Sequence, residues 1–167
     1  MEFLEKDLEQ IICEADNDLL QEKGLYVNGI KKRQLRIGNY GIADIVMFNR
    51  TYDYDFTDNK YIPYLEITIL ELKKEKVGIG AFLQSLKYCK GIKTFFELKK
   101  PNIKFKMNIV LASKEVDKNG DFIFLTDLIS NDSYGFINNI DLYSFKYDIN
   151  GIIFKKECEY NLIHKGF

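Results

Sequence analysis

Two charged residues end an otherwise apolar stretch in the middle of the chain, and their types suit metal or acid–base chemistry. The stretch from Tyr64 to Lys74 is mostly apolar as far as Leu70 and then reaches Glu71 and Lys73. Strand side chains alternate with a period of two, so Glu71 and Lys73 point to one face, roughly 6–7 Å apart. Charged residues seldom lie in a core without a task, so the chain is expected to present this carboxylate and amine together.

A second carboxylate, Asp44, is the only charged residue between Ile42 and Phe48. If this strand pairs in antiparallel fashion with the strand of Glu71, the two carboxylates converge on one point. Two carboxylates and a backbone oxygen form a hard oxygen site for Mg²⁺ or Mn²⁺, where Lys73 would orient or deprotonate a water for attack on a phosphodiester. A plain ion pair between Glu71 and Lys73, with Asp44 ending in a turn, explains the same spacing.

Three polar residues on the following helix form a candidate supporting group. Gln84, Lys87 and Tyr88 stand at i, i+3 and i+4, so they share a side of that helix. At 3.6 residues per turn this side is expected to lie roughly opposite Phe82 and Leu86. The group contributes to a site only if it faces the Glu71 end of the sheet; otherwise its members are solvated or packing residues.

The first helix offers a further acid. Glu5 lies three residues before Leu8 and would reach the site if the helix packs across the end of the sheet. Glu9 competes for the same role, and the leucine spacing favours Glu5. A plain surface acid on an acidic helix is the alternative.

The elements that must position these residues follow from periodicity and turn signals. Pro63 is expected to open the central strand, and 49–62 to form a protruding hairpin end. The other expected elements are a helix over 2–21, a strand or hairpin arm over 25–38, strands over 42–48 and 107–112, helices over 81–98 and 121–130, and a terminal hairpin of 141–147 and 152–156. The fold class is therefore α/β, with a mixed central sheet flanked by helices and a C-terminal β-hairpin.

Length and composition bound the possibilities. The 167 residues suit one domain, with a core over about 1–113 and a C-terminal extension over about 114–167. The formal net charge is −1, but it conceals an acidic first helix and seven lysines between Lys87 and Lys106. The single histidine argues against Ser-His or Cys-His catalysis. Three cysteines without metal-like spacing, and the lack of a signal sequence, predict a soluble cytoplasmic protein.

Basic residues supply candidate contacts to nucleic acid. A basic run over 31–36 precedes Asp44. Lys74 ends the central stretch, and Lys87 lies on the expected helix over 81–98. A solvated face is the plainer explanation of such charges. As nucleic-acid contacts, the candidates are Lys31, Lys32, Arg33, Arg36, Lys74 and Lys87.

These residues together resemble the PD-(D/E)XK nuclease superfamily. Gly41-Ile42-Ala43-Asp44 resembles its Gly-x-x-Asp motif, and Glu71-Leu72-Lys73 resembles its Glu-x-Lys motif. Gln84 with Tyr88 is similar to the Gln and Tyr pair of RecB-like and NucS-like members. Glu5-x-x-Leu8 resembles the first-helix glutamate of NucS-like nucleases and archaeal Holliday-junction resolvases. The match covers about half of the chain, in the family's order.

The resemblance implies a restriction-endonuclease-like fold and metal-dependent phosphodiester hydrolysis that leaves 5′-phosphate and 3′-hydroxyl ends, by an endonuclease or an exonuclease. It implies Asp44, Glu71 and the Leu72 carbonyl as ligands of Mg²⁺ or Mn²⁺, and Lys73 as the water-orienting group, with DNA preferred to RNA as substrate. A homodimer would allow both strands of a duplex to be cut. The rivals are a nucleic-acid-binding module of the same fold without turnover, and an interaction protein whose terminal hairpin pairs with a partner.

Overall fold

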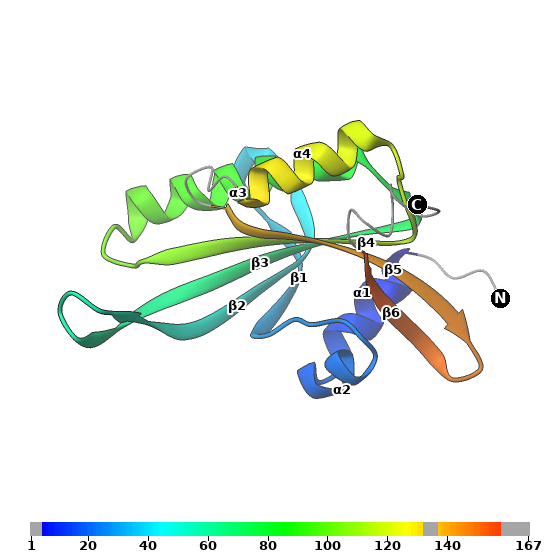
Figure 1. Cartoon of the computed structure of the whole chain (residues 1–167), viewed down its shortest axis with the longest axis horizontal. Coiled ribbons are helices and arrows are strands. Elements are labelled where there is room, and N and C mark those ends of the chain that lie inside the picture. Colours follow the sequence, from blue (N-terminus) through cyan, green and yellow to red (C-terminus); the bar gives the residue numbers. More distant parts are fainter. Residues whose placement is uncertain (1–4, 132–136, 158–167) are drawn as a thin grey trace.

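A mixed sheet of six strands forms the centre of the computed structural model, which describes residues 5–131 and 137–157 (Figure 1). In order across the sheet, the strands are β1 (Ile30–Arg36), β2 (Ile42–Asp55), β3 (Lys60–Val77), β4 (Phe105–Val116), β5 (Ile137–Asp148) and β6 (Gly151–Glu157). β1, β2 and β3 pair in antiparallel fashion, β3, β4 and β5 run parallel, and β6 returns antiparallel to β5. The predicted α/β class, with a mixed sheet and a C-terminal hairpin, is confirmed.

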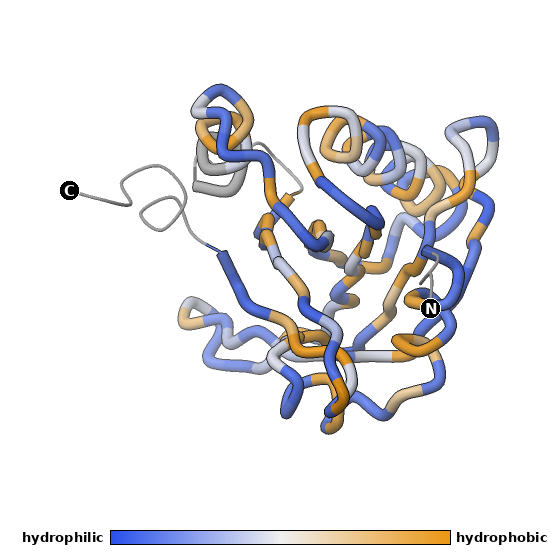
Figure 2. The backbone as a smooth tube through the Cα atoms, turned by 90° about the vertical axis from the view of Figure 1, so that its right-hand side faces the viewer, coloured by the Kyte–Doolittle hydropathy of each residue, from blue (hydrophilic) through white to orange (hydrophobic). Residues whose placement is uncertain are grey.

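Helices cover both faces of this sheet. Helix α3 (Ile79–Lys99) and helix α4 (Gly120–Asn131) connect successive parallel strands and lie together above the sheet (Figures 1 and 2). Two right-handed crossovers that step the same way across a sheet place their helices on the same face. Helices α1 (Glu5–Glu14) and α2 (Asn17–Glu22) cover the other face, and the short 3₁₀ helix η1 (Gly38–Tyr40) joins β1 to β2.

The central strand β3 contributes to two hydrophobic clusters, one on each face. Ile67 and Ile69 belong to the cluster under α3 and α4. Leu70 and Leu72 belong to the cluster under α1 and α2. This alternation places Glu71 and Lys73 on the α3 side, in line with Ile67 and Ile69, as their spacing predicts.

The far ends of β2 and β3 form a two-stranded ribbon. β1 pairs with β2 only as far as Phe48, and β4 pairs with β3 only from Leu65. In the segment 49–64, β2 and β3 therefore pair only with each other. The ribbon agrees with the hairpin expected over 49–62. The expectation that Pro63 opens the strand is wrong, because β3 begins at Lys60 and Pro63 pairs with Tyr52 inside the ribbon. Proline is tolerated there because the ribbon has an open edge.

The first helix also differs from its expected form. In place of one helix over 2–21, α1 ends at Glu14 and α2 begins at Asn17. Asp16 between them is extended, with φ −66° and ψ 151°, which is the backbone conformation of an N-cap. Among the described residues, no helix combines the length and apolar character needed to cross a bilayer.

The packing of α3 against η1 can be tested with two glycines of α3, one at the contact and one away from it. A Cβ atom at Gly91 would lie 2.6 Å from Ile37 Cγ2 and 2.7 Å from Tyr40 Cδ2, whereas a Cβ atom at Gly80 would meet nothing within 4 Å. We expect Gly91→Ala to lower the free energy of unfolding by about 1–3 kcal/mol through overpacking. Gly80→Ala should raise it by up to about 1 kcal/mol, because alanine is the better helix former. Urea denaturation measures both, and equal effects would contradict this packing.

Candidate active site

Asp44 and Glu71 face each other where the ladder between β2 and β3 ends. The last paired residues are Ile45 and Leu70, one position before the two acids. Beyond that point side chains replace the backbone ladder. The Leu72 N–H donates to Asp44 Oδ2 at 2.8 Å, and the Asp44 N–H donates to Glu71 Oε1 at 3.3 Å. Each carboxylate is therefore fixed by a backbone amide of the opposite strand.

This pair of carboxylates is held in a low-dielectric position. Glu71 is only 1% exposed. Burial, followed by the negative charge of Asp44, raises the pKa of Glu71 to about 8. Burial also raises the pKa of Asp44, and the hydrogen bond from the Leu72 amide opposes that rise. Two acids that resist ionisation side by side are typical of functional sites, and a bound cation would relieve both penalties.

Lys73 stands beside this pair as a third charge. Its ammonium group is half-buried and lowers the pKa of both Asp44 and Glu71. Within the described part of the chain, its side chain forms no hydrogen bond or ion pair. The plain ion pair between Glu71 and Lys73 is thus not formed, and the amine stays available to a ligand or water.

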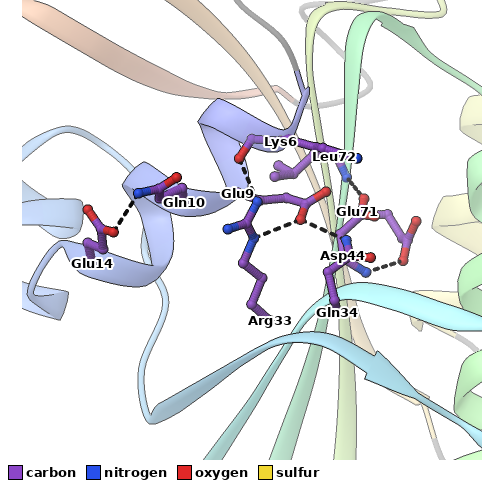
Figure 3. A network of polar contacts seen from close by, with 9 residues as sticks. All are labelled: Lys6, Glu9, Gln10, Glu14, Arg33, Gln34, Asp44, Glu71 and Leu72. Carbon is purple, nitrogen blue, oxygen red and sulfur yellow. Dashed lines mark hydrogen bonds and ion pairs between the residues drawn. The ribbon is translucent and has the colours of Figure 1, made fainter.

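Helix α1 brings both of its candidate glutamates to the end of β3. Glu5 Oε1 accepts a hydrogen bond of 2.9 Å from the Lys74 N–H. Glu9 is 3% exposed, and its Oε2 accepts from Arg33 Nε at 3.0 Å and from Gln34 Nε2 at 2.7 Å. Figure 3 shows the Glu9 carboxylate pointing from the helix toward Asp44. The first helix therefore anchors the strand end through Glu5 and places a second buried acid through Glu9.

Gln34 is the site residue that the sequence did not indicate, and Glu9, the rival of Glu5 for the helix position, belongs to the site as well. Glu9 lies four residues after Glu5, so both occupy one side of α1, and this spacing was the signal that could have included both. Gln34 has φ +51° and interrupts the pairing of β1 with β2 between Arg33 and Leu35. This interruption, which the sequence does not reveal, turns the Gln34 amide toward Glu9.

Tyr88 fixes the strand that carries Asp44. Its hydroxyl donates to the Ile42 carbonyl at 2.8 Å and accepts a hydrogen bond from the exposed Gln84 amide. The expected placement opposite Phe82 is wrong for Tyr88, which is buried in the same cluster as Phe82. The hydroxyl proton is committed to Ile42, so Tyr88 acts as a positioning residue.

Gly41 gives the Gly-x-x-Asp spacing a physical reason. Its φ of +126° and ψ of −157° lie in a region that is essentially restricted to glycine. A Cβ atom there would also lie 3.0 Å from Cε1 of Tyr88. Both the turn into β2 and the packing of the Tyr88 ring therefore require glycine at position 41.

The basic run that precedes Asp44 is divided between the two faces of the sheet. Lys31 donates to the Ala15 carbonyl, and Arg33 pairs with Glu9, so both hold α1. Lys32 and Arg36 are exposed. Lys87 is exposed on α3, and the Lys74 amide is bound by Glu5. Lys31 and Lys74 are half-buried, whereas the other four members of the predicted nucleic-acid set are exposed, with Arg33 also paired to Glu9.

The charges around the site add up to a cation-binding environment. Four carboxylates and two cations contribute to it, namely Asp44, Glu71, Glu5 and Glu9 with Lys73 and Arg33. Fully ionised, they leave a formal surplus of two negative charges, which equals the charge of one divalent ion. Among the described residues, no group of three or more Cys, His, Asp or Glu side chains has the geometry of a metal site. Mg²⁺ is commonly held by one or two carboxylates and substrate phosphates, so the Asp44–Glu71 pair fits it.

Comparisons with protein-family models, curated proteins and solved structures found no match for this chain.

The raised pKa of Glu71 sets the pH dependence of stability without metal. The pKa of glutamate in an unfolded chain is near 4.5, whereas the pKa of Glu71 in the folded protein is about 8. Between these values the folded state binds the extra proton, so stability falls as the pH rises through this window. Glu71→Gln removes this loss. In EDTA at pH 9, we expect the variant to be more stable than wild type by about 1–3 kcal/mol, measured by urea unfolding.

Glu75→Gln is the matched control on the same strand, because Glu75 is exposed and pairs only loosely with Lys114, at 3.3 Å. It should retain the wild-type slope of stability against pH. A wild-type slope in Glu71→Gln would show that Glu71 is ionised in the folded protein throughout this range.

Proposed function

We propose that the protein is a metal-dependent nuclease that hydrolyses DNA phosphodiester bonds. The observation that carries the proposal is the pair of half-buried Asp44 and buried Glu71 where β2 and β3 separate, with the Lys73 amine beside it. The arrangement is compatible with the PD-(D/E)XK resemblance, since Glu5, Asp44, Glu71 and Lys73 come to one end of a mixed sheet.

The residues divide into holding and positioning roles. Asp44 and Glu71, with the Leu72 carbonyl, would hold Mg²⁺ or Mn²⁺. When bound, the ion supplies Lewis-acid polarisation of the phosphate and a water of lowered pKa. Each carboxylate accepts a backbone amide with one oxygen, and the Asp44 and Glu71 side chains also hydrogen-bond to each other, an interaction that the ion would replace.

Lys73 would supply a positive charge for the phosphate or the attacking water. Its ammonium group lies on the same strand face as Glu71, where it would bind the scissile phosphate or orient the attacking water. Tyr88 keeps Ile42, and with it Asp44, in place, and Glu5 does the same for the strand after Lys73. In-line attack by the oriented water then leaves a 5′-phosphate and a 3′-hydroxyl.

A cytoplasmic location belongs to the same proposal. Cys13 and Cys89 are free thiols, as a reducing compartment would leave them. DNA is preferred to RNA through the resemblance alone. A binding module without turnover has little use for a buried, mutually repelling acid pair, which costs folding energy in the absence of metal.

The test is cleavage of single-stranded, duplex and branched DNA with Mg²⁺ or Mn²⁺. Asp44→Asn and Lys73→Ala should each lower the rate by at least about 100-fold, because each removes a group that acts on the transition state. EDTA should abolish cleavage.

Lys76→Ala is the matched control, since Lys76 lies three residues further along β3 and pairs with Asp117 at the surface. It should cut at the wild-type rate. Equal cleavage by wild type and Lys73→Ala would falsify the assignment. Metal-independent binding without cleavage of any substrate would favour the non-catalytic module.

A further inference from the structure

An apolar groove lies between the second half of α3 and the β1–η1 segment. It encloses about 470 Å³, which is within the range of pockets that hold small ligands. Its lining is largely aliphatic and aromatic, and includes Leu35, Phe48, Phe95, Phe96 and Leu98. Neither Asp44 nor Glu71 contributes to the lining, so the groove is separate from the candidate active site.

Large hydrophobic side chains in and beside the groove remain in solvent. Phe95 is 53% exposed and Leu98 is 73% exposed. Phe48 also lines the groove, and alternation along β2 places Tyr52 on the same face four residues further on. Tyr52 is exposed too, so a further aromatic side chain lies on this face of the ribbon, with Arg50 between it and Phe48. Exposed apolar side chains grouped around an apolar groove are typical of a recognition site.

The charged residues that line the groove are both positive. Arg36 and Lys99 line the groove. Lys32 pairs with Val46 of the α3-side cluster, and Arg50 lies two residues beyond Phe48, so both belong to the same face. None of these four cations forms an ion pair with a described residue. The only acid on this half of α3, Glu97, is outside the lining and pairs with Lys93.

The groove and the candidate active site are joined by β2 and η1. Phe48 follows Asp44 by four residues, about 13 Å along the strand. Tyr40 lines the groove, and Gly41 next to it packs on Tyr88. One extended strand of nucleic acid is long enough to reach from the acids to the groove.

We propose that this groove binds an unpaired base of a nucleic-acid substrate, with the neighbouring phosphates on Arg36 and Lys99. The inference rests on the proposed function and names its substrate class as single-stranded or branched DNA. Aromatic side chains hold single strands by stacking on exposed bases, and cations follow the backbone. A fully paired duplex keeps its bases stacked inside, so it cannot fill an apolar groove.

A second copy of the chain is a poorer occupant. In a twofold dimer the same patch meets itself, so the cations of one copy, Arg36 and Lys99, would meet those of the other, and the lining holds no acid to neutralise them. Like charges brought together across an interface oppose association. The positive rim therefore favours a polyanion.

Fluorescence anisotropy of the wild-type chain in EDTA tests the proposal, because binding is then measured without metal. The probes are a fluorescein-labelled oligo-dT strand and a blunt duplex. Phe95→Ala should weaken binding of the single strand by about tenfold or more and binding of the duplex by less than about twofold. Lys99→Ala should reduce the salt dependence of single-strand binding by about one unit in the log–log slope.

Leu83→Ala is the matched control, since Leu83 is a 50% exposed hydrophobic residue on the same helix and does not line the groove. It should bind both probes like wild type. Equal weakening of both probes by Phe95→Ala, or none, would overturn the proposal. So would an unchanged salt slope in Lys99→Ala, or a dimer in sedimentation velocity that Phe95→Ala dissociates.

The two proposals can fail separately. Phe95-dependent binding of the single strand, without metal-dependent cleavage of any substrate, would keep the groove and remove the nuclease. Cleavage that depends on Lys73, together with binding that ignores Phe95, would keep the nuclease and remove the groove.

Discussion

The buried carboxylate of Glu71 and the half-buried carboxylate of Asp44 share the gap in which strands β2 and β3 separate, and the surrounding structure holds them there. Asp44 and Glu71 each take a backbone amide from the opposite strand, so the strand ends are joined through the acids themselves. Tyr88 secures β2 through the Ile42 carbonyl, and Glu5 secures β3 through the Lys74 amide. Burial and repulsion oppose ionisation of the pair, and this unfavourable energy is what a divalent cation would remove.

Most of the fold follows from local patterns in the sequence. Alternation along β3 separates Ile67 and Ile69 from Leu70 and Leu72, and the structure assigns these pairs to opposite clusters. The errors arise where tertiary context decides. The first helix is broken at Asp16, and Pro63 lies within a strand because the ribbon leaves one edge open. Neither the break nor the open edge can be read from periodicity alone.

The part of the candidate site that depends on residue spacing along strands was predictable from the sequence. Alternation put Glu71 and Lys73 on one face, and the antiparallel pairing brought Asp44 to them. The role of Gln34 was not predictable, because it depends on an interruption of strand pairing, and the choice between Glu5 and Glu9 depends on how α1 packs against β1. The sequence predicted that the basic run over 31–36 forms one set of nucleic-acid contacts. Because side chains alternate along β1, Arg33 pairs with Glu9 and Lys32 is exposed on the other face. Long-range packing determined those outcomes.

We propose that Asp44 and Glu71 together hold a divalent cation. A crystal soaked in Mn²⁺ and measured for anomalous scattering tests it most directly. The account predicts an anomalous peak within about 2.0–2.3 Å of an oxygen of each carboxylate, absent from crystals of Glu71→Gln soaked in the same way. A wild-type crystal without a peak at this position, with Glu71 paired instead to the Lys73 amine, would contradict it.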